Sequence, residues 1–323
     1  MQSSKKISAF IKLGIVCLAL WFLYQKVFSN ESYSEVKTQF LSILSDGSYI
    51  ELVLVFFLMF INWSIDAIKW QFLVSKLEKV SFWLALKAVF LGITVSIFTP
   101  NRIGEFGGRV FCLQQADRLK AVLVTIFGNI TQLVTTIIFG VLAFLFFSSL
   151  YTHLLFTKSD YGIYILLVLS VVVFTVLIYL LYNVSQLSSL FSRWKFLDKY
   201  KSYAPVFSLF SSKDISKVLF LSMLRYTVYS FQFYLLIKFA NIEINLLQSL
   251  TMSALTFLSM SIIPTIALTE LGVRGSVAIY FFGFLSSNAI GIMTASFALW
   301  IINLVVPAII GVFFVYQLKF FRK

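Results

Sequence analysis

Eight apolar segments, separated by short polar stretches, dominate this sequence of 323 residues. They cover Ile7–Phe28, Ile50–Lys69, Phe82–Thr99, Ala121–Leu150, Tyr161–Tyr182, Val218–Phe239, Leu246–Ile263 and Asn288–Tyr316. A helix needs about 20 apolar residues to cross a bilayer, so most of these segments are long enough to span a membrane. With 60% hydrophobic and only 12% charged residues, the chain has too little polar surface for a soluble globule. The sequence therefore predicts an all-α integral membrane protein, built as one membrane domain over residues 1–323.

The remaining composition excludes several classes of site and partner. Cys17 and Cys112 lie in apolar surroundings without a C-x-x-C spacing, so we expect buried thiols. The single histidine, His153, falls in a predicted outer loop, which excludes a histidine-rich metal site. The net charge of +13 indicates anionic lipid headgroups and not nucleic acid, because no basic surface with interleaved aromatic residues lies outside the apolar segments. We expect membrane lipids as partners, no nucleic-acid partner, no cofactor and no metal.

Lysine and arginine orient the segments, because cytoplasmic loops carry an excess of these residues. They concentrate before the first segment and at 69–79, 193–217 and 319–323, whereas the stretch 29–48 is acidic. The segment Ile7–Phe28 is longer than the apolar region of a signal peptide and lacks a small-residue cleavage site, so we expect a retained first span. These features predict a multi-pass protein of the inner (cytoplasmic) cell membrane with cytoplasmic N- and C-termini.

The number of segments conflicts with this orientation unless one segment turns back within the membrane. Three apolar segments lie between the cytoplasmic stretches 69–79 and 193–217, and an odd number of crossings cannot return to the same side. Phe82–Thr99 is the candidate for the exception, because it is short and runs into Pro100 and a glycine cluster. Residues 105–118 then form the returning arm.

The second half of the chain has the same conflict. Between 193–217 and the C-terminus, the segment Leu246–Ile263 runs into Pro264, and Glu270–Leu285 provides a returning arm. The sequence thus predicts about six full spans plus two re-entrant helical hairpins.

The two predicted hairpins contain similar motifs. The first reads SIFTP followed by EFGGR, and the second reads SIIP followed by ELGVR. A spacing of 165 residues separates Ser96 from Ser261 and also Glu105 from Glu270. The agreement of motif and spacing predicts an internal duplication, with halves of about 1–155 and 156–323.

Each predicted half contains three full crossings, which is an odd number. The second half must therefore run in the opposite orientation to the first, so that the two form an inverted repeat. Inverted repeats whose broken helices meet near the midplane are typical of transporters. Two nearly equivalent halves can exchange inward-open and outward-open shapes at similar energy, which is the basis of alternating access.

Ionisable groups at membrane depth cost about 2.5–3.5 kcal/mol each, so each requires a reason. The hairpins carry Arg102, Glu105, Arg109, Glu270 and Arg274. Two Glu–Arg pairs with a spacing of four residues each lie on one helical face. One interpretation is that each pair neutralises itself and holds its hairpin. The other is that Arg102, Arg109 and Arg274 bind a lipid phosphate in two-point geometry, while Glu105 or Glu270 carries a proton or pairs with an amino group.

Two further segments carry candidate substrate-binding residues. Asn62 and Asp66 share one helical face with Lys69 in the second apolar segment. Arg225 lies about 165 residues beyond this region, so we expect it to face the same cavity.

Other polar residues in the spans have simpler interpretations. We expect Lys69 to extend to the inner membrane surface, and Trp63 and Trp70 to anchor at the interface. The amides of Asn129, Gln132 and Asn303 are weaker candidates, because a single amide in a span commonly serves a helix–helix contact.

These residues resemble the lysylphosphatidylglycerol synthetase transmembrane-region family, also called the flippase-like domain. The resemblance lies in Asn62–Trp70, in PNRIGE at 100–105 with Arg109, and in Pro264–Arg274, and it covers nearly the whole chain. Its members resemble lipid translocases, and the best-known ones carry a soluble aminoacyl-transferase domain and move aminoacylated phosphatidylglycerol across the membrane. We expect this chain to act without that domain. The second motif departs from the family pattern, because Glu270 precedes the glycine instead of following the arginine, so the resemblance assigns no role to Glu270.

The leading functional hypothesis is a lipid flippase or transporter for an anionic, aminoacylated or glycosylated lipid, and not an enzyme. A membrane-embedded transferase or phosphatase acting on a lipid phosphate is one alternative, although such enzymes usually need a histidine or clustered acids. A non-transporting partner subunit of an envelope-lipid transferase is another. The sequence does not specify the oligomeric state.

Overall fold

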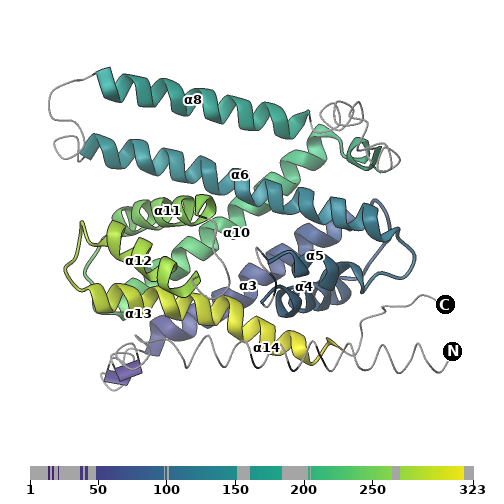
Figure 1. The fold of residues 1–323 in the computed structure, drawn as a ribbon, viewed down its shortest axis with the longest axis horizontal. Helices are drawn as coiled ribbons and strands as arrows, with labels where there is room; N and C mark the ends of the chain where they lie inside the picture. Colours follow the sequence, from purple (N-terminus) through teal and green to yellow (C-terminus); the bar gives the residue numbers. More distant parts are fainter. Residues whose placement is uncertain are drawn as a thin grey trace.

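The computed structural model describes residues 49–97, 99, 102–150, 161–183, 203, 205–263 and 270–315, together with a few positions before residue 49 (Figure 1). Every regular element in these ranges is a helix, which confirms the prediction of an all-α chain. Most of the first predicted span lies outside the described residues, as do His153, Pro100 and Pro264. Of Glu270, only the backbone is described.

Within the described ranges, three continuous helical stretches are long and apolar enough to cross a membrane. They are α3 (Tyr49–Val74), the first 31 residues of α6 (Arg118–Leu150), and Ala289–Val312, which contains α13 (Ala289–Trp300), the π-helix η3 (Ile301–Val305) and α14 (Val306–Val312). Two further long helices, α8 (Tyr161–Tyr182) and α10 (Ser212–Phe239), accompany them. In Figure 1, α8 lies along α6 at one edge of the molecule.

The first predicted hairpin folds as α4 (Phe82–Ser96) and α5 (Gly104–Val110). The helix ends before Pro100, as the sequence predicts. The Thr99 hydroxyl accepts the Gly104 N–H at 2.9 Å, so a side chain at the break begins the next helix. The two helices touch through glycines, because a Cβ added to Gly108 would lie 2.7 Å from the Gly92 Cα atom. Only residues without a side chain permit this approach of the two backbones.

The second predicted hairpin folds as α11 (Leu246–Ile262) and α12 (Glu270–Phe282). Asn245 and Gln248 form a capping box at the start of α11, which satisfies backbone N–H groups that a helix leaves unpaired. In Figure 1, α11 and α12 lie towards the opposite end of α6 from α4 and α5.

Contacts between distant parts of the sequence join the two halves. The Gln232 side chain on α10 donates to the Val55 carbonyl on α3 at 2.9 Å. The Thr94 hydroxyl on α4 donates to the Ala308 carbonyl on α14 at 2.8 Å, next to Gly311, where any side chain would collide with α4. The first hairpin is therefore held by α14, the last helix that the structure describes.

Candidate functional site: a cationic cavity among the helices

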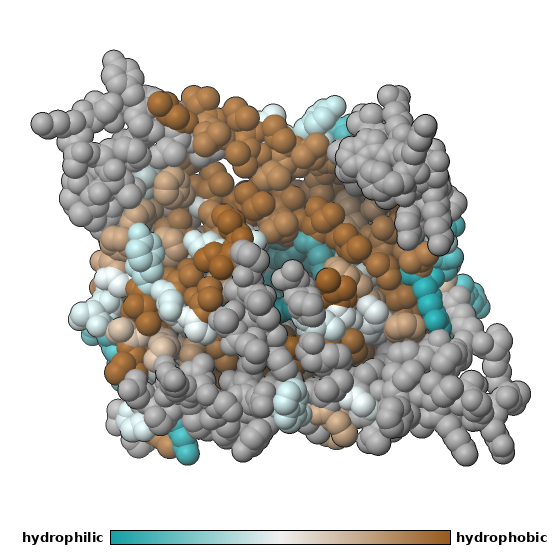
Figure 2. Space-filling view, viewed as in Figure 1, coloured by the Kyte–Doolittle hydropathy of each residue, from teal (hydrophilic) through white to brown (hydrophobic). Residues whose placement is uncertain are grey.

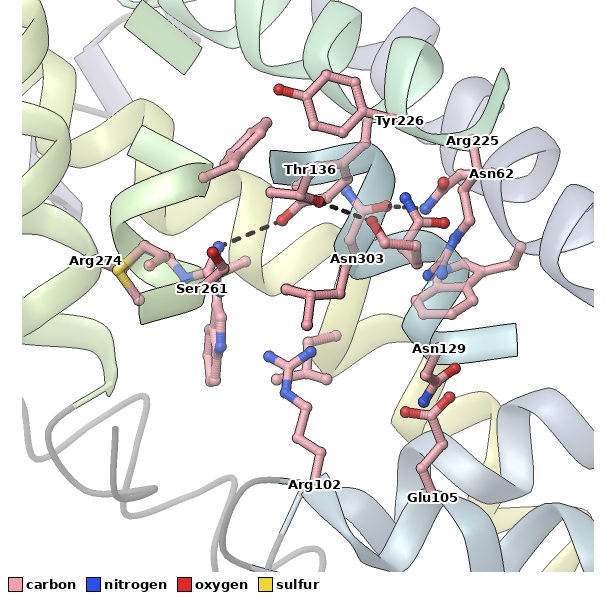
Figure 3. A pocket seen from close by; sticks show the side chains of 18 residues that line it. Asn62, Arg102, Glu105, Asn129, Thr136, Arg225, Tyr226, Ser261, Arg274 and Asn303 are labelled. Carbon is pink, nitrogen blue, oxygen red and sulfur yellow. Dashed lines mark hydrogen bonds between the residues drawn. The ribbon is translucent and has the colours of Figure 1, made fainter. Parts of the chain in front are cut away.

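A cavity of about 380 Å³ lies among α3, α5, α6, α10, α11, α12 and α13 with η3 (Figure 3). Its charged lining residues are Arg102, Glu105, Arg225 and Arg274. Amides, hydroxyls and aromatic rings complete much of the wall, from Asn62, Trp63, Asn129, Gln132, Thr136, Tyr226, Tyr229, Ser261, Trp300 and Asn303. Figure 2 shows a hydrophilic recess near the middle of this face, bordered on its upper side by hydrophobic residues. The molecule thus encloses a polar, cation-rich space within apolar helices.

Arg225 on α10 reaches the cavity between two partners. Its Nη1 atom donates to Asp66 Oδ1 at 3.1 Å, and its guanidinium carbon lies 4.7 Å from the centre of the Trp63 ring. A planar guanidinium stacked on an aromatic ring keeps its in-plane N–H groups available for further acceptors. The side chain is therefore oriented at the cavity wall and able to bind an anion edge-on.

Asp66 itself lies behind the wall and is fully buried. It contacts three cations, because Arg109 Nη2 donates to Oδ2 at 2.6 Å and Lys69 Nζ lies 3.3 Å from Oδ1, in addition to Arg225. Arg109 also pairs with Glu105 on its own helix. A buried charge is tolerated where it is paired and hydrogen-bonded, and removal of one partner leaves the others uncompensated. This cluster connects α3, α5 and α10 through one carboxylate.

A helical irregularity supplies one of the amides in the wall. Pro307 has no N–H to donate one turn back, and the preceding residues form the π-helix Ile301–Val305. Asn303 lies in this π-helix, and its Oδ1 atom accepts the Asn62 amide at 3.2 Å. Within the described part of the chain, the buried Asn62 Oδ1 atom has no hydrogen-bond partner.

The remaining arginines reach the cavity from the two hairpins. Arg102, just before α5, has a φ of 57°, in the left-handed region that non-glycine residues seldom adopt. Strain of this kind concentrates at binding and catalytic sites. Arg274 on α12 approaches from another side, and its guanidinium lies 3.4 Å from the Tyr229 hydroxyl (Figure 3).

The predicted site residues therefore fall into two groups. Asn62, Arg102, Glu105, Arg225 and Arg274 line the cavity. Asp66 and Arg109 lie behind it, in the buried cluster. The Glu105–Arg109 ion pair is present as the spacing predicts, whereas the side chain of Glu270 lies outside the described residues.

Three of the simpler interpretations were wrong. Lys69 does not extend to a membrane surface; it is 2% exposed, because Asp66 binds its ammonium group inside the protein. Trp70 is 1% exposed and donates to the Thr125 hydroxyl at 3.0 Å, and Trp63 is buried beneath Arg225. Neither tryptophan is an interface anchor. The sequence did contain a signal for this, because Asn62 and Asp66 share the helical face of Lys69 and indicate that this side of α3 faces the protein interior.

Sequence reasoning did not select several lining residues. The sequence assigned no role to Tyr226, Tyr229 and Thr136, and Ser261 served only to define the spacing of the repeat. In the described residues no group of three or more His, Cys, Asp or Glu side chains is arranged to hold a metal ion. The described lining of the cavity can bind a ligand through hydrogen bonds and charge, from guanidinium, amide and hydroxyl groups.

Comparison with known proteins gives one family match. The family model described as "Lysylphosphatidylglycerol synthase TM region" matches residues 9–311, which confirms the resemblance noted in the sequence. No curated protein matches the chain.

Proposed function

The chain belongs to the lysylphosphatidylglycerol synthase transmembrane-region family, and from this premise we propose that it moves a phospholipid with an anionic headgroup between the leaflets of the cell membrane. The headgroup occupies the cavity while the lipid chains remain in the apolar surroundings. In this proposal the protein is a transporter and not an enzyme, and the lipid leaves chemically unchanged. The membrane is the inner one, and both termini are cytoplasmic.

The observation that carries the proposal is the charge of the cavity. Of the described lining residues, Arg102, Arg225 and Arg274 are cationic and Glu105 is the single carboxylate. Guanidinium groups match phosphate oxygens in two-point geometry. An excess of guanidinium groups disfavours a headgroup with net positive charge, such as a lysyl ester. Among the lipid classes that the sequence left open, the cavity therefore favours an anionic one, with or without a sugar.

The arrangement of the hairpins supports alternating access. The helices α4 and α5 lie towards one end of α6, and α11 and α12 towards the other. In the proposal each pair enters from one face of the membrane as half of an inverted repeat, and the chain makes about six full crossings. Arg102 and Arg274 then approach one headgroup from the two hairpins, so that a shift of either hairpin changes which side the cavity opens to.

Leaflet exchange tests the proposal directly. The purified protein is reconstituted into vesicles of phosphatidylcholine and phosphatidylglycerol with a trace of tail-labelled fluorescent phosphatidylglycerol. External dithionite quenches only the label in the outer leaflet, so the slow loss of the remaining fluorescence measures the rate at which inner-leaflet lipid moves outward. A hydrogen bond to a charged group is worth about 1.5–3 kcal/mol, so loss of both hairpin arginines in Arg102→Gln/Arg274→Gln should slow exchange at least about tenfold.

The matched control is Lys213→Gln/Lys238→Gln, which removes the same charge from exposed positions on α10. We expect it to exchange lipid at the wild-type rate. Equal rates for the wild type, the arginine variant and empty vesicles would contradict lipid transport.

A further inference from the structure

An apolar groove of about 250 Å³ lies between α6 and α8. Its described lining is entirely apolar: Ile137, Ile138, Val141, Leu142, Leu145, Val171, Val173, Phe174 and Leu177. The helix α8 meets the rest of the protein mainly along α6, so the groove is formed by two adjacent apolar helices and not by the central core.

The groove begins where the cavity ends. Leu133 lines the cavity and is 44% exposed, and Ile137, Val141 and Leu145 line the groove. These four residues are spaced by four, so they form one row along the surface of α6 in which each side chain adjoins the next. A continuous apolar path therefore runs from the wall of the cationic cavity into the groove.

The length of this path suits one lipid chain. At 1.5 Å per residue, the row from Leu133 to Leu145 covers about 18 Å. One leaflet contributes about half of the ~30 Å hydrocarbon core, or ~15 Å, and a lipid chain crosses that distance. A polar site beside an apolar path of this length has the two-part chemistry of a phospholipid, with a charged head and an adjoining hydrocarbon tail.

We propose that the groove between α6 and α8 seats one hydrocarbon chain of the same lipid whose phosphate lies in the cavity. This inference rests on the proposed function and adds a tail site to it. The competing occupant is bulk membrane lipid, which fills any apolar groove regardless of its headgroup. Selectivity for the headgroup at the position of the tail therefore separates the two.

Photocrosslinking measures this selectivity. The full-length protein in phosphatidylcholine vesicles receives a trace of phosphatidylglycerol that carries a diazirine on one acyl chain, and labelled peptides are mapped after irradiation. We expect labels on 137–145 of α6 and 171–177 of α8, and we expect excess unlabelled phosphatidylglycerol to remove them while excess phosphatidylcholine does not. Equal competition by both lipids would overturn the proposal and assign the groove to bulk lipid.

Two variants connect the tail to the headgroup. Arg274→Gln should reduce groove labelling several-fold although it changes no groove residue, because the labelled chain loses its anchored head. Val141→Trp/Leu145→Trp fills the groove and should abolish labelling there. The control Ile165→Trp/Val168→Trp adds the same rings to exposed positions of α8 outside the groove and should leave labelling unchanged.

The exchange assay separates this inference from the proposed function. If labelling is headgroup-selective but the wild type moves no lipid, the tail site stands and transport fails. If the wild type moves lipid, while Val141→Trp/Leu145→Trp exchanges at the wild-type rate and labelling is unselective, transport stands and the tail site fails.

Discussion

The two hairpins carry nearly the same motif and use it differently. In the first, Arg109 is 2% exposed and bound between Asp66 and Glu105, behind the cavity. In the second, the corresponding Arg274 is only partly buried, lines the cavity and approaches the Tyr229 hydroxyl.

The packing around the glycines also differs between the two motifs. The first motif has a second glycine, Gly108, where the second motif has Val273. Gly108 presses against the backbone of Gly92, whereas a Cβ on Gly272, the counterpart of Gly107, would meet no atom of the described residues within 4 Å. The first hairpin is thus fixed by close packing and a buried ion pair, and the second presents its arginine to the cavity. Two similar motifs therefore have different roles, because the residues on the neighbouring helices determine what each arginine contacts.

The largest effect should come from the carboxylate that fixes the first hairpin. Asp66→Asn leaves Lys69, Arg109 and Arg225 without their shared counterion, and removal of one member of a buried ionic cluster costs about 3–5 kcal/mol. We expect a large loss of folded protein in detergent, measured by thermal unfolding and size-exclusion chromatography. Glu51→Gln, which makes the same charge change at the start of α3, is the control. Equal melting temperatures for the two variants would show that the cluster does not hold the hairpin.

Substitution of the two motif arginines tests the comparison itself. Arg109→Ala should lower the free energy of unfolding by about 3 kcal/mol, because it leaves the buried Asp66 with less compensation and removes the partner of Glu105. Arg274→Ala should change stability by less than about 1 kcal/mol and should slow lipid exchange instead. Thermal unfolding and leaflet exchange are measured on both variants. The reverse pattern, or the same loss of stability in both, would contradict separate roles.

Alanine at the motif glycines should give a smaller difference. Gly108→Ala forces the α4 and α5 backbones apart and should cost about 1–3 kcal/mol, as overpacking does. Gly272→Ala adds a methyl group that meets no described residue, and it should be neutral or stabilising by up to about 1 kcal/mol, because alanine favours a helix over glycine. Thermal unfolding measures both, and an equal cost would mean that the hairpins are packed alike.

The smallest effect is expected outside both hairpins, where Asp214 at the start of α10 pairs with Lys76 at 2.9 Å. The hydrogen bond from Lys76 and the Ser211 backbone N–H lower the pKa of Asp214. The folded state therefore binds this proton more weakly, so the contribution is complete above the ordinary carboxyl pKa of ~4 and is lost as the pH falls below it.

Thermal unfolding between pH 3 and 7 tests this contribution. Asp214→Asn should cost about 0.5 kcal/mol at pH 7 and almost nothing at pH 3, since exposed pairs contribute little. A cost that matches that of Asp66→Asn would show that burial is not what makes the Asp66 cluster strong.

Much of the architecture was predictable from local patterns. The lengths of the apolar segments predicted the helices, and Pro100 with its neighbouring glycines predicted the break after α4. Both features depend only on the local sequence. Charge spacing likewise gave the Glu105–Arg109 pair, since residues four apart on a helix are adjacent whatever the tertiary structure.

Contacts between helices were not predictable in this way. The Asp66–Arg109 pair joins residues on α3 and α5, and the position of Lys69 follows from that cluster and not from its neighbours in sequence. Length alone suggests that a lysine near a helix end reaches the surface, and only the packed structure shows a carboxylate close enough to retain it. Which arginine faces the cavity depends on the same packing.

Because one carboxylate is shared among α3, α5 and α10, its partners compete for it. A phosphate that draws Arg225 towards the cavity weakens the link between α10 and α3 and leaves Asp66 more completely to Lys69 and Arg109. In the proposed transport, a phosphate in the cavity would thereby loosen the contact between α10 and α3 and tighten the contact between α3 and α5 by an exchange of counterions, without a proton being gained or lost.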